Sequence, residues 1–232
     1  PRHTTNSNHR YHKWKNLIHG FEPMAANQLW VADITYIMLN NGDVCYLHLI
    51  TDAYSRMIVG WELADTLRAS ITLKALEQAI SQTGGVSLEG LTHHSDRGVQ
   101  YCCDDYVRML QTHQIKISMN EDYNPTDNTI AERAKGVIKT ETVYSRKTFN
   151  SLEHARNVIG RFIHFYNYRR PHMSIGYKIP AVVHTETGAQ KKMWKKKNYP
   201  KKAYNNGNNG ISLPCRTTGA DDGCNHHTVY SI

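Results

Sequence analysis

Long apolar runs are absent from this sequence of 232 residues, whose mean hydropathy is −0.59. A transmembrane helix needs about 20 consecutive apolar residues, and no stretch of the sequence reaches that length. The N-terminus carries histidines and arginines but lacks the apolar segment that defines a secretory signal peptide. We therefore expect a cytosolic protein without a membrane span or a secretory leader.

Paired cysteine motifs are absent too. The five cysteines are Cys45, Cys102, Cys103, Cys215 and Cys224. Their number is odd and no Cys-x-x-Cys pair occurs, so we interpret them as reduced thiols and not as a disulfide framework. The candidate ligands for a zinc ion in the tail are Cys215, Cys224, His226 and His227. That spacing fits no common zinc module, and incidental residues explain it better.

Positive charge is plentiful but concentrated in one segment. The net charge is +8, and seven lysines without an accompanying acid fall between Lys191 and Lys202, which leaves about +1 for the rest of the chain. Such a run is often only a solvated segment. Here aromatic residues are interleaved with it, which suits contact with nucleic-acid phosphates and stacking on bases. The tail lysines expected to contact DNA are Lys191, Lys192, Lys195, Lys196 and Lys197.

The first half of the chain predicts a three-stranded antiparallel meander. Residues 29–37 alternate between two faces in the manner of a strand, with Asp33 in the middle. A turn containing Asn and Gly leads to a strand over 44–50, and a second turn leads to a strand over 57–63. An acid inside the first strand is costly without a partner, because its neighbours are apolar.

The second half predicts helices and strands in alternation. Helices are expected over 71–81, 104–113 and 152–168, and short strands over 91–95 and 115–119. Asp127 or Asn128 is a natural N-cap for a further helix. A meander followed by this alternation indicates an α/β fold with a five-stranded mixed sheet flanked by helices.

Composition divides the chain into three segments. Residues 1–26 are polar and are interpreted as a linker, and a start without methionine suggests a fragment of a longer chain. Residues 27–183 contain the predicted strands and helices and form the expected core. Residues 184–232 are basic, with too few apolar residues to pack, and we expect them to be disordered without DNA.

Three acids stand out from their surroundings: Asp33, Asp96 and Glu132. Asp33 could be bonded to a turn, and Asp96 could be an ordinary turn acid before Gly98. Glu132 could complete a capping box with Thr129. Taken together, the three separated carboxylates suggest a site that gathers hard divalent cations, because carboxylate oxygens are the ligands that such ions prefer.

The predicted helix that carries Glu132 also carries two lysines beside that acid. Residues three and four apart are neighbours on a helix, so Lys135 and Lys139 share the face of Glu132. Two such lysines could be a plain solvated face. Beside a cation site, however, their ammonium groups are suited to hold DNA phosphates.

Four motifs resemble the integrase core of IS3-family insertion-sequence transposases and, more distantly, retroviral integrases. They are Trp30–Tyr36, His94–Tyr101, Asp127-Asn128 followed by Glu132, and Tyr166-Asn167-x-x-Arg170-Pro171-His172. The 35 residues between Asp96 and Glu132 match the DD(35)E spacing of that group. The resemblance covers roughly residues 27–183. The sequence departs from the family pattern at Arg133-Ala134-Lys135, where the family usually has Ser-Phe-Phe.

The resemblance implies a ribonuclease-H-like fold in which Asp33, Asp96 and Glu132 converge as catalytic residues and metal ligands. It implies a DDE-type polynucleotidyl transferase that uses Mg²⁺ or Mn²⁺, with two ions about 4 Å apart. Water would first cut a phosphodiester at an element end, and the released 3′-OH would then attack a second phosphodiester. The residues expected to contact DNA are Asn128, Lys135, Lys139 and Arg170, together with the tail lysines.

The resemblance also implies partners and a place in the cell. The partners are transposon-end DNA, target DNA, further copies of this chain on DNA, and a helix-turn-helix protein or upstream region. The implied location is the bacterial cytoplasm, at the nucleoid. Two other functions are compatible with the motifs, namely a catalytically inactive DNA-binding remnant and a ribonuclease-H-like nuclease without strand transfer. The intact acid triad argues against the first, and the integrase-type spacing argues against the second.

Overall fold

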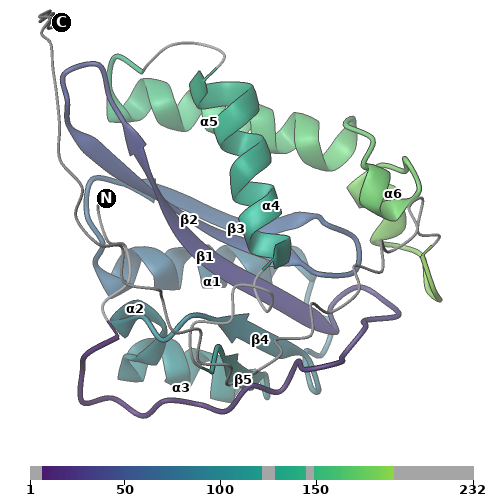
Figure 1. Cartoon of the computed structure of the whole chain (residues 1–232). Coiled ribbons are helices and arrows are strands. Elements are labelled where there is room, and N and C mark those ends of the chain that lie inside the picture. The colour runs from purple at the N-terminus through teal and green to yellow at the C-terminus, as the bar shows by residue number, and fades with distance from the viewer. Residues whose placement is uncertain (1–6, 122–128, 145–148, 191–232) are drawn as a thin grey trace, which may run out of the picture. The chain divides into compact units, whose positions relative to one another are not determined.

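Five strands form one mixed sheet in the computed structural model, which describes residues 7–121, 129–144 and 149–190 (Figure 1). The strands are β1 (Leu29–Met38), β2 (Val44–Asp52), β3 (Ile58–Ala64), β4 (Thr92–Ser95) and β5 (Lys116–Met119). Their order in the sheet is β3-β2-β1-β4-β5. The pairs β1–β2 and β2–β3 are antiparallel, whereas β1–β4 and β4–β5 are parallel. The predicted mixed sheet of five strands is thereby confirmed.

Helices cover both faces of this sheet (Figure 1). One face carries α1 (Ala69–Gln82), α2 (Val99–Cys102) and α3 (Asp104–Thr112). The other carries α4 (Thr129–Ile138), a π-helical turn (Lys139–Tyr144) and α5 (Leu152–Tyr168). A 3₁₀ turn (Met173–Ile175) and α6 (Pro180–Val183) follow α5. Among the helices of the described residues, none is long and apolar enough to cross a membrane.

Strand β1 lies in the middle of the sheet and separates the two apolar layers. Trp30, Ala32 and Ile34 point into the layer under α1 and α3. The odd-numbered positions Leu29 and Val31 point to the opposite face, where they pack against apolar residues of α4. This alternation follows from the two-residue period of a strand. It also places Asp33 on the face that α4 covers.

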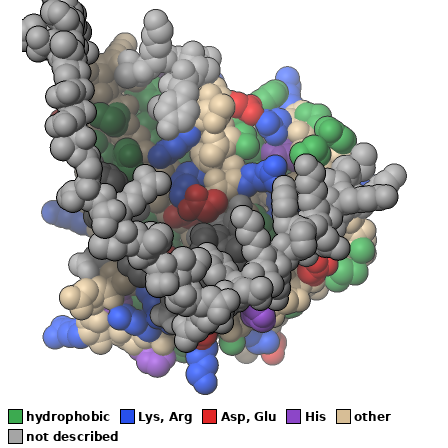
Figure 2. Space-filling model, viewed as in Figure 1, with side chains coloured by type: hydrophobic (Ala, Val, Ile, Leu, Met, Phe, Trp, Pro, Cys, Tyr) green, Lys and Arg blue, Asp and Glu red, His purple; other side chains and the backbone are tan. Residues whose placement is uncertain are grey.

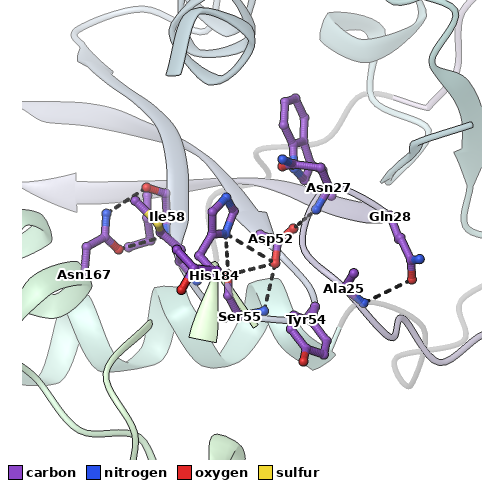
Figure 3. Close-up of polar contacts among 12 residues, drawn as sticks. Ala25, Asn27, Gln28, Asp52, Tyr54, Ser55, Ile58, Asn167 and His184 are labelled. Atoms are coloured by element: carbon purple, nitrogen blue, oxygen red, sulfur yellow. Dashed lines mark hydrogen bonds and ion pairs between the residues drawn. The ribbon is translucent and has the colours of Figure 1, made fainter. Parts of the chain in front are cut away.

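The turn between β2 and β3 is held by a buried polar network (Figure 3). Asp52 is fully buried, and its Oδ1 accepts hydrogen bonds from the backbone N–H and the hydroxyl of Ser55 at 2.8 and 2.7 Å. Its Oδ2 accepts from the backbone N–H of Asn27 at 2.8 Å. Ser55 Oγ lies 2.9 Å from Nδ1 of His184, which follows α6. The side-chain amide of Asn167 bonds both backbone groups of Ile58, each at 2.9 Å. These bonds connect the turn to the residue pair before β1, to the end of α5 and to the segment after α6.

The described residues before β1 lie along the core. Tyr11 and Trp14 pack against the apolar layer of α1 and α3. The backbone N–H of Leu17 donates to Ser118 Oγ at 2.8 Å, next to the end of β5. Part of the segment that we interpret as a linker therefore packs on the core. The domain boundary at residue 27 stays a prediction.

The chain remains in contact with the core beyond residue 183, where we expect the tail to begin. The backbone N–H of Gly188 donates to the carbonyl of Met24 at 2.7 Å, and the hydroxyl of Tyr54 donates to the carbonyl of Gly188 at 3.0 Å. Together with the contact of His184 with Ser55, these bonds show that residues 184–190 contact the core, and the domain boundary at residue 183 stays a prediction. Residues 191–232, which hold the lysine run, lie outside the described residues.

Candidate active site

Asp33 and Asp96 lie level with each other on neighbouring parallel strands. The parallel ladder pairs Val31 of β1 with His94 of β4. Asp33 is two residues beyond Val31, and Asp96 is two residues beyond His94. The two carboxylates therefore lie in the same region of the sheet, although 62 residues separate them in the sequence.

Helix α4 brings the third acid and a cation to this region. Lys135 Nζ lies 2.8 Å from Asp33 Oδ2 and 2.7 Å from Glu132 Oε1, so one ammonium group bridges a strand acid and a helix acid. The Asp33 side chain is 12% exposed and that of Lys135 is 20% exposed, whereas Glu132 is 57% exposed. Figure 2 shows acidic side chains bordered by Lys and Arg side chains on this face.

Burial has the largest effect on the pKa of Asp33, and neighbouring charges have smaller effects. Burial raises the pKa of the Asp33 carboxyl to about 6. Lys135 lowers this pKa, while the neighbouring carboxylates of Asp96 and Glu132 raise it further. The three acids thus interact with one another across the site. Such mutual repulsion favours a shared cation.

Asp96 is oriented by the tight turn that follows β4. Its Oδ1 accepts a hydrogen bond from the backbone N–H of Gly98 at 2.9 Å. A Cβ atom at position 98 would lie only 2.9 Å from this same oxygen and 3.0 Å from the Gln100 side-chain oxygen. A side chain at position 98 would therefore require the Asp96 carboxylate or the Gln100 amide to shift.

The three acids match the ligand preference of Mg²⁺ or Mn²⁺, because each offers hard carboxylate oxygens. However, no group of three or more His, Cys, Asp or Glu side chains in the described ranges is arranged as a ready metal site. The ammonium of Lys135 takes the position between Asp33 and Glu132. The carboxylate oxygens are suitable ligands for a divalent ion, and the metal-binding role of the triad stays a prediction.

The residues predicted to contact DNA lie in different surroundings. Lys135 is engaged by the two acids, and Lys139 Nζ lies 4.5 Å from the centre of the Tyr36 ring. Arg170 Nη2 lies 2.6 Å from Glu141 Oε1. The predicted DNA ligands that fall outside the described residues are Asn128, Lys191, Lys192, Lys195, Lys196 and Lys197. DNA contact by each of these side chains stays a prediction.

Two features of the site were not foreseen from the sequence. One is the bridging position of Lys135, which depends on how α4 packs on β1. The other is a pocket beside α4 whose lining includes Arg56 and Arg133. The only sequence signal for Arg56 is the turn Asp52–Arg56, whose short polar residues bond the backbone at the end of β2.

Comparison with known proteins places this geometry in a family. Two integrase core domain models match the chain, one over residues 23–125 and the other over residues 113–180. Together they cover β1–β5, α4 and α5, and therefore all three acids. The chain belongs to the integrase core family. The resemblance to insertion-sequence transposases is thereby confirmed for the core.

Curated transposases are similar to this integrase core in sequence. One is a putative transposase for insertion sequence element IS986/IS6110 of Mycobacterium tuberculosis, 36% identical over 174 residues, which are 74% of this chain and 62% of that protein. Another is the insertion element IS600 uncharacterized 31 kDa protein of Shigella sonnei, 39% identical over 180 residues, 77% of this chain and 65% of that protein. The chain therefore spans less than two thirds of the length of these relatives.

Retroviral proteins are among the solved structures similar to the integrase core. A chain of the simian T-cell lymphotropic virus intasome in complex with PP2A regulatory subunit B56 gamma has a TM-score of 0.61 at 18% identity, covering 84% of this chain and 66% of that one. The HTLV-2 integrase catalytic core domain in complex with magnesium has a TM-score of 0.55 at 19% identity, covering 70% and 99%. These likenesses confirm the ribonuclease-H-like fold.

Proposed function

We propose that this chain is the catalytic core of a DDE-type transposase that cuts DNA at the ends of an insertion sequence and joins them to target DNA. The observation that carries the proposal is that Asp33 and Glu132 both contact the ammonium group of Lys135. Asp96 is close enough to raise the pKa of Asp33. Membership of the integrase core family supports the same chemistry. The proposed substrates are transposon-end DNA and target DNA.

The proposed reaction consists of two transfers at phosphorus. Water attacks a phosphodiester at the element end, and the bond to the neighbouring nucleotide breaks to release a 3′-OH. That hydroxyl then attacks a second phosphodiester and displaces its 3′ oxygen, so strands are joined without a covalent protein intermediate. Neither step requires a Ser or Tyr nucleophile.

Asp33, Asp96 and Glu132 are the proposed metal ligands, with two Mg²⁺ or Mn²⁺ ions as the proposed cofactor. When bound, such ions activate the attacking oxygen and stabilise the leaving oxygen. In this structure the Lys135 ammonium contacts two of the three carboxylates and offsets part of their negative charge. An ion held by the same oxygens would take over that role, and Lys135 would then be available to a DNA phosphate.

The proposed working state is a homo-oligomer on DNA in the bacterial cytoplasm, at the nucleoid. A helix-turn-helix protein or region would recognise the end sequence. This part of the proposal is supported by the transposase relatives and by the fold shared with an intasome subunit.

The test is a strand-cleavage and strand-transfer assay with DNA duplexes that end in the sequences flanking the gene, in the presence of Mg²⁺. Asp33→Asn, Asp96→Asn and Glu132→Gln are each expected to abolish both cleavage and the joining of a pre-cut 3′-OH end. The matched control is Asp105→Asn, which removes an exposed acid on α3. Cleavage without joining would support a nuclease instead, and full joining by Glu132→Gln would contradict a single shared site.

A further inference from the structure

We propose that a pocket next to the acids binds a phosphate group of the DNA backbone through Arg56, Arg133 and His172. The pocket has a volume of about 500 Å³ and is formed by the end of β2, the β2–β3 turn, α4, the end of α5 and the segment after it. Its polar lining consists of Thr51, Arg56, Arg133, Tyr166, Arg170, His172, Ser174 and Tyr177. That the anion belongs to DNA rests on the proposed function, whereas the anion site itself does not.

Arg56 is the central residue of this pocket. Its Nε and Nη1 atoms are hidden from solvent, yet neither has a hydrogen-bond partner among the described residues. Burial lowers the pKa of the Arg56 guanidinium, but an arginine remains charged at neutral pH. The nearest acid, Asp52, has both carboxylate oxygens engaged by Ser55 and Asn27. A buried charge with free donors is costly unless an anion joins it.

The backbone of Arg56 is held in an uncommon conformation that presents this side chain. Its φ is +69°, in the left-handed region that residues with a side chain seldom adopt. The backbone N–H donates to the Asp52 carbonyl at 2.9 Å, and the buried network of Asp52 and Ser55 fixes the turn. Strain of this kind persists only where the surroundings enforce it, and it occurs most often at functional sites.

Two further donors in the lining lack partners. Thr51 Oγ1 and His172 Nε2 are both hidden from solvent without a hydrogen bond among the described residues. His172 Nδ1 lies 3.5 Å from Arg170 Nη1, which can only donate, so the imidazole accepts there. Burial and the neighbouring Arg170 lower the pKa of His172 to about 4. A neutral ring that accepts at Nδ1 carries its proton on Nε2, which is then a donor without a partner among the described residues.

The charges of the side chains that line the pocket favour the binding of an anion. No Asp or Glu occurs among the described residues that line it, whereas three arginines do. Arg170 is already paired with Glu141 outside the lining. Arg133 is exposed, and its charge lowers the pKa of Arg56, so the two guanidinium groups repel each other. An anion between them would offset that repulsion and engage the unpartnered atoms of Arg56.

The position of the pocket favours DNA as the source of this anion. Arg133 directly follows Glu132, so helix α4 contributes both to the pocket and to the group of three acids. A phosphodiester offers two charged oxygens, which match the forked donors of arginine. Phosphate contacts of this kind set the position of a protein on a duplex without reading its sequence. A phosphate held here would therefore position a strand relative to the catalytic acids.

Binding of the whole chain to a DNA duplex in EDTA, measured over a range of salt concentrations, tests the proposal without catalysis. Arg133→Gln and Arg56→Gln should each weaken binding and reduce the slope of log affinity against log salt by about one unit, the value for one lost phosphate contact. The control is Arg108→Gln, which removes an exposed arginine on α3 and should leave the slope nearly unchanged. If the Arg56→Gln variant does not fold, the result for Arg133→Gln alone decides the test, because Arg133 is exposed.

Inorganic phosphate provides a second probe, through broadening of its ³¹P resonance by the protein. Broadening that is lost in Arg133→Gln and kept in Asp33→Asn supports the pocket even if strand transfer is never observed. Conversely, transfer activity with no difference between Arg133→Gln and the wild type in either measurement overturns the pocket and leaves the proposed function standing. Binding of a poly-glutamate peptide but not of DNA or phosphate would also overturn it, in favour of a protein partner.

Discussion

Lys135 Nζ lies 2.8 Å from Asp33 Oδ2, and this ion pair joins helix α4 to the central strand β1. The same ammonium also contacts Glu132 at 2.7 Å. A lysine therefore occupies the position between two of the three acids to which we assign the metal. A tethered cation of this kind neutralises carboxylates that would otherwise repel one another in a partly buried site.

Replacing Lys135 should strengthen metal binding. In Lys135→Met the acids lose their internal cation, so the apo protein is expected to melt at a lower temperature than the wild type. Mn²⁺ then no longer competes with an ammonium group, and it should raise the melting temperature by more in the variant than in the wild type. Lys74→Met, which changes an exposed lysine of α1, serves as the control. If Mn²⁺ raised the melting temperature of Lys135→Met by no more than that of the wild type, the metal and the Lys135 ammonium would not share one position.

The two lysines of α4 should contribute to DNA binding under different conditions. Lys135→Ala with Lys139→Ala is expected to reduce the salt slope of DNA binding by about two units when Mg²⁺ is present, one for each lost phosphate contact. In EDTA the reduction should be about one unit, because Lys135 is then held by the acids. The measurement is a salt titration of DNA affinity with and without Mg²⁺. If the change in the salt slope were the same with Mg²⁺ and in EDTA, the metal would not release Lys135 from the acids.

Truncation should separate the packed residues from the lysine run. A chain ending at Gln190 is expected to keep its stability and to lose DNA affinity most at low salt, because the tail lysines are gone. A chain ending at Val183 also loses the hydrogen bonds of His184 and Gly188 with the core. At about 1 kcal/mol for each bond, we expect roughly 3 kcal/mol less stability by urea unfolding. Equal stability of the two truncated chains would show that these contacts contribute nothing.

Buried histidines should make the fold sensitive to acid. Burial lowers the pKa of His48 from 6.5 to about 4 and that of His93 to about 3. Because the unfolded chain then binds protons more readily than the folded one, stability is fully present above pH 6.5 and is lost as pH falls through 4. His48 alone accounts for about 3 kcal/mol of this loss.

Urea unfolding measured at a series of pH values checks this expectation. His48→Gln should flatten the decline between pH 6.5 and pH 4, since the variant has one buried imidazole fewer. His19→Gln, at an exposed position, should follow the wild-type curve. The same decline in His48→Gln and in the wild type would assign the acid sensitivity to other groups.

Local patterns in the sequence were enough to predict strands and helices of the fold. The two-residue alternation of residues 29–37 predicts a strand that is observed as Leu29–Met38, and helical spacing predicts 152–168, which is observed as Leu152–Tyr168. These patterns succeed because strand and helix periods are imposed by the nearest neighbours in the chain. Short elements such as α2 and α6, each of four residues, carry too few apolar positions to show a period.

The pairing of charges was decided by the tertiary structure. The sequence places Lys135 beside Glu132, but its contact with Asp33 arises only because α4 packs across β1. Likewise, the sequence shows a turn at Asp52–Arg56, whereas the burial of the Arg56 guanidinium depends on α4 and the end of α5 closing over it. Sequence by itself determined which residue types were available for chemistry and in which elements they stand. Their partners were set by packing, because an ammonium or guanidinium group bonds whichever acceptor the assembled layers bring within about 3 Å.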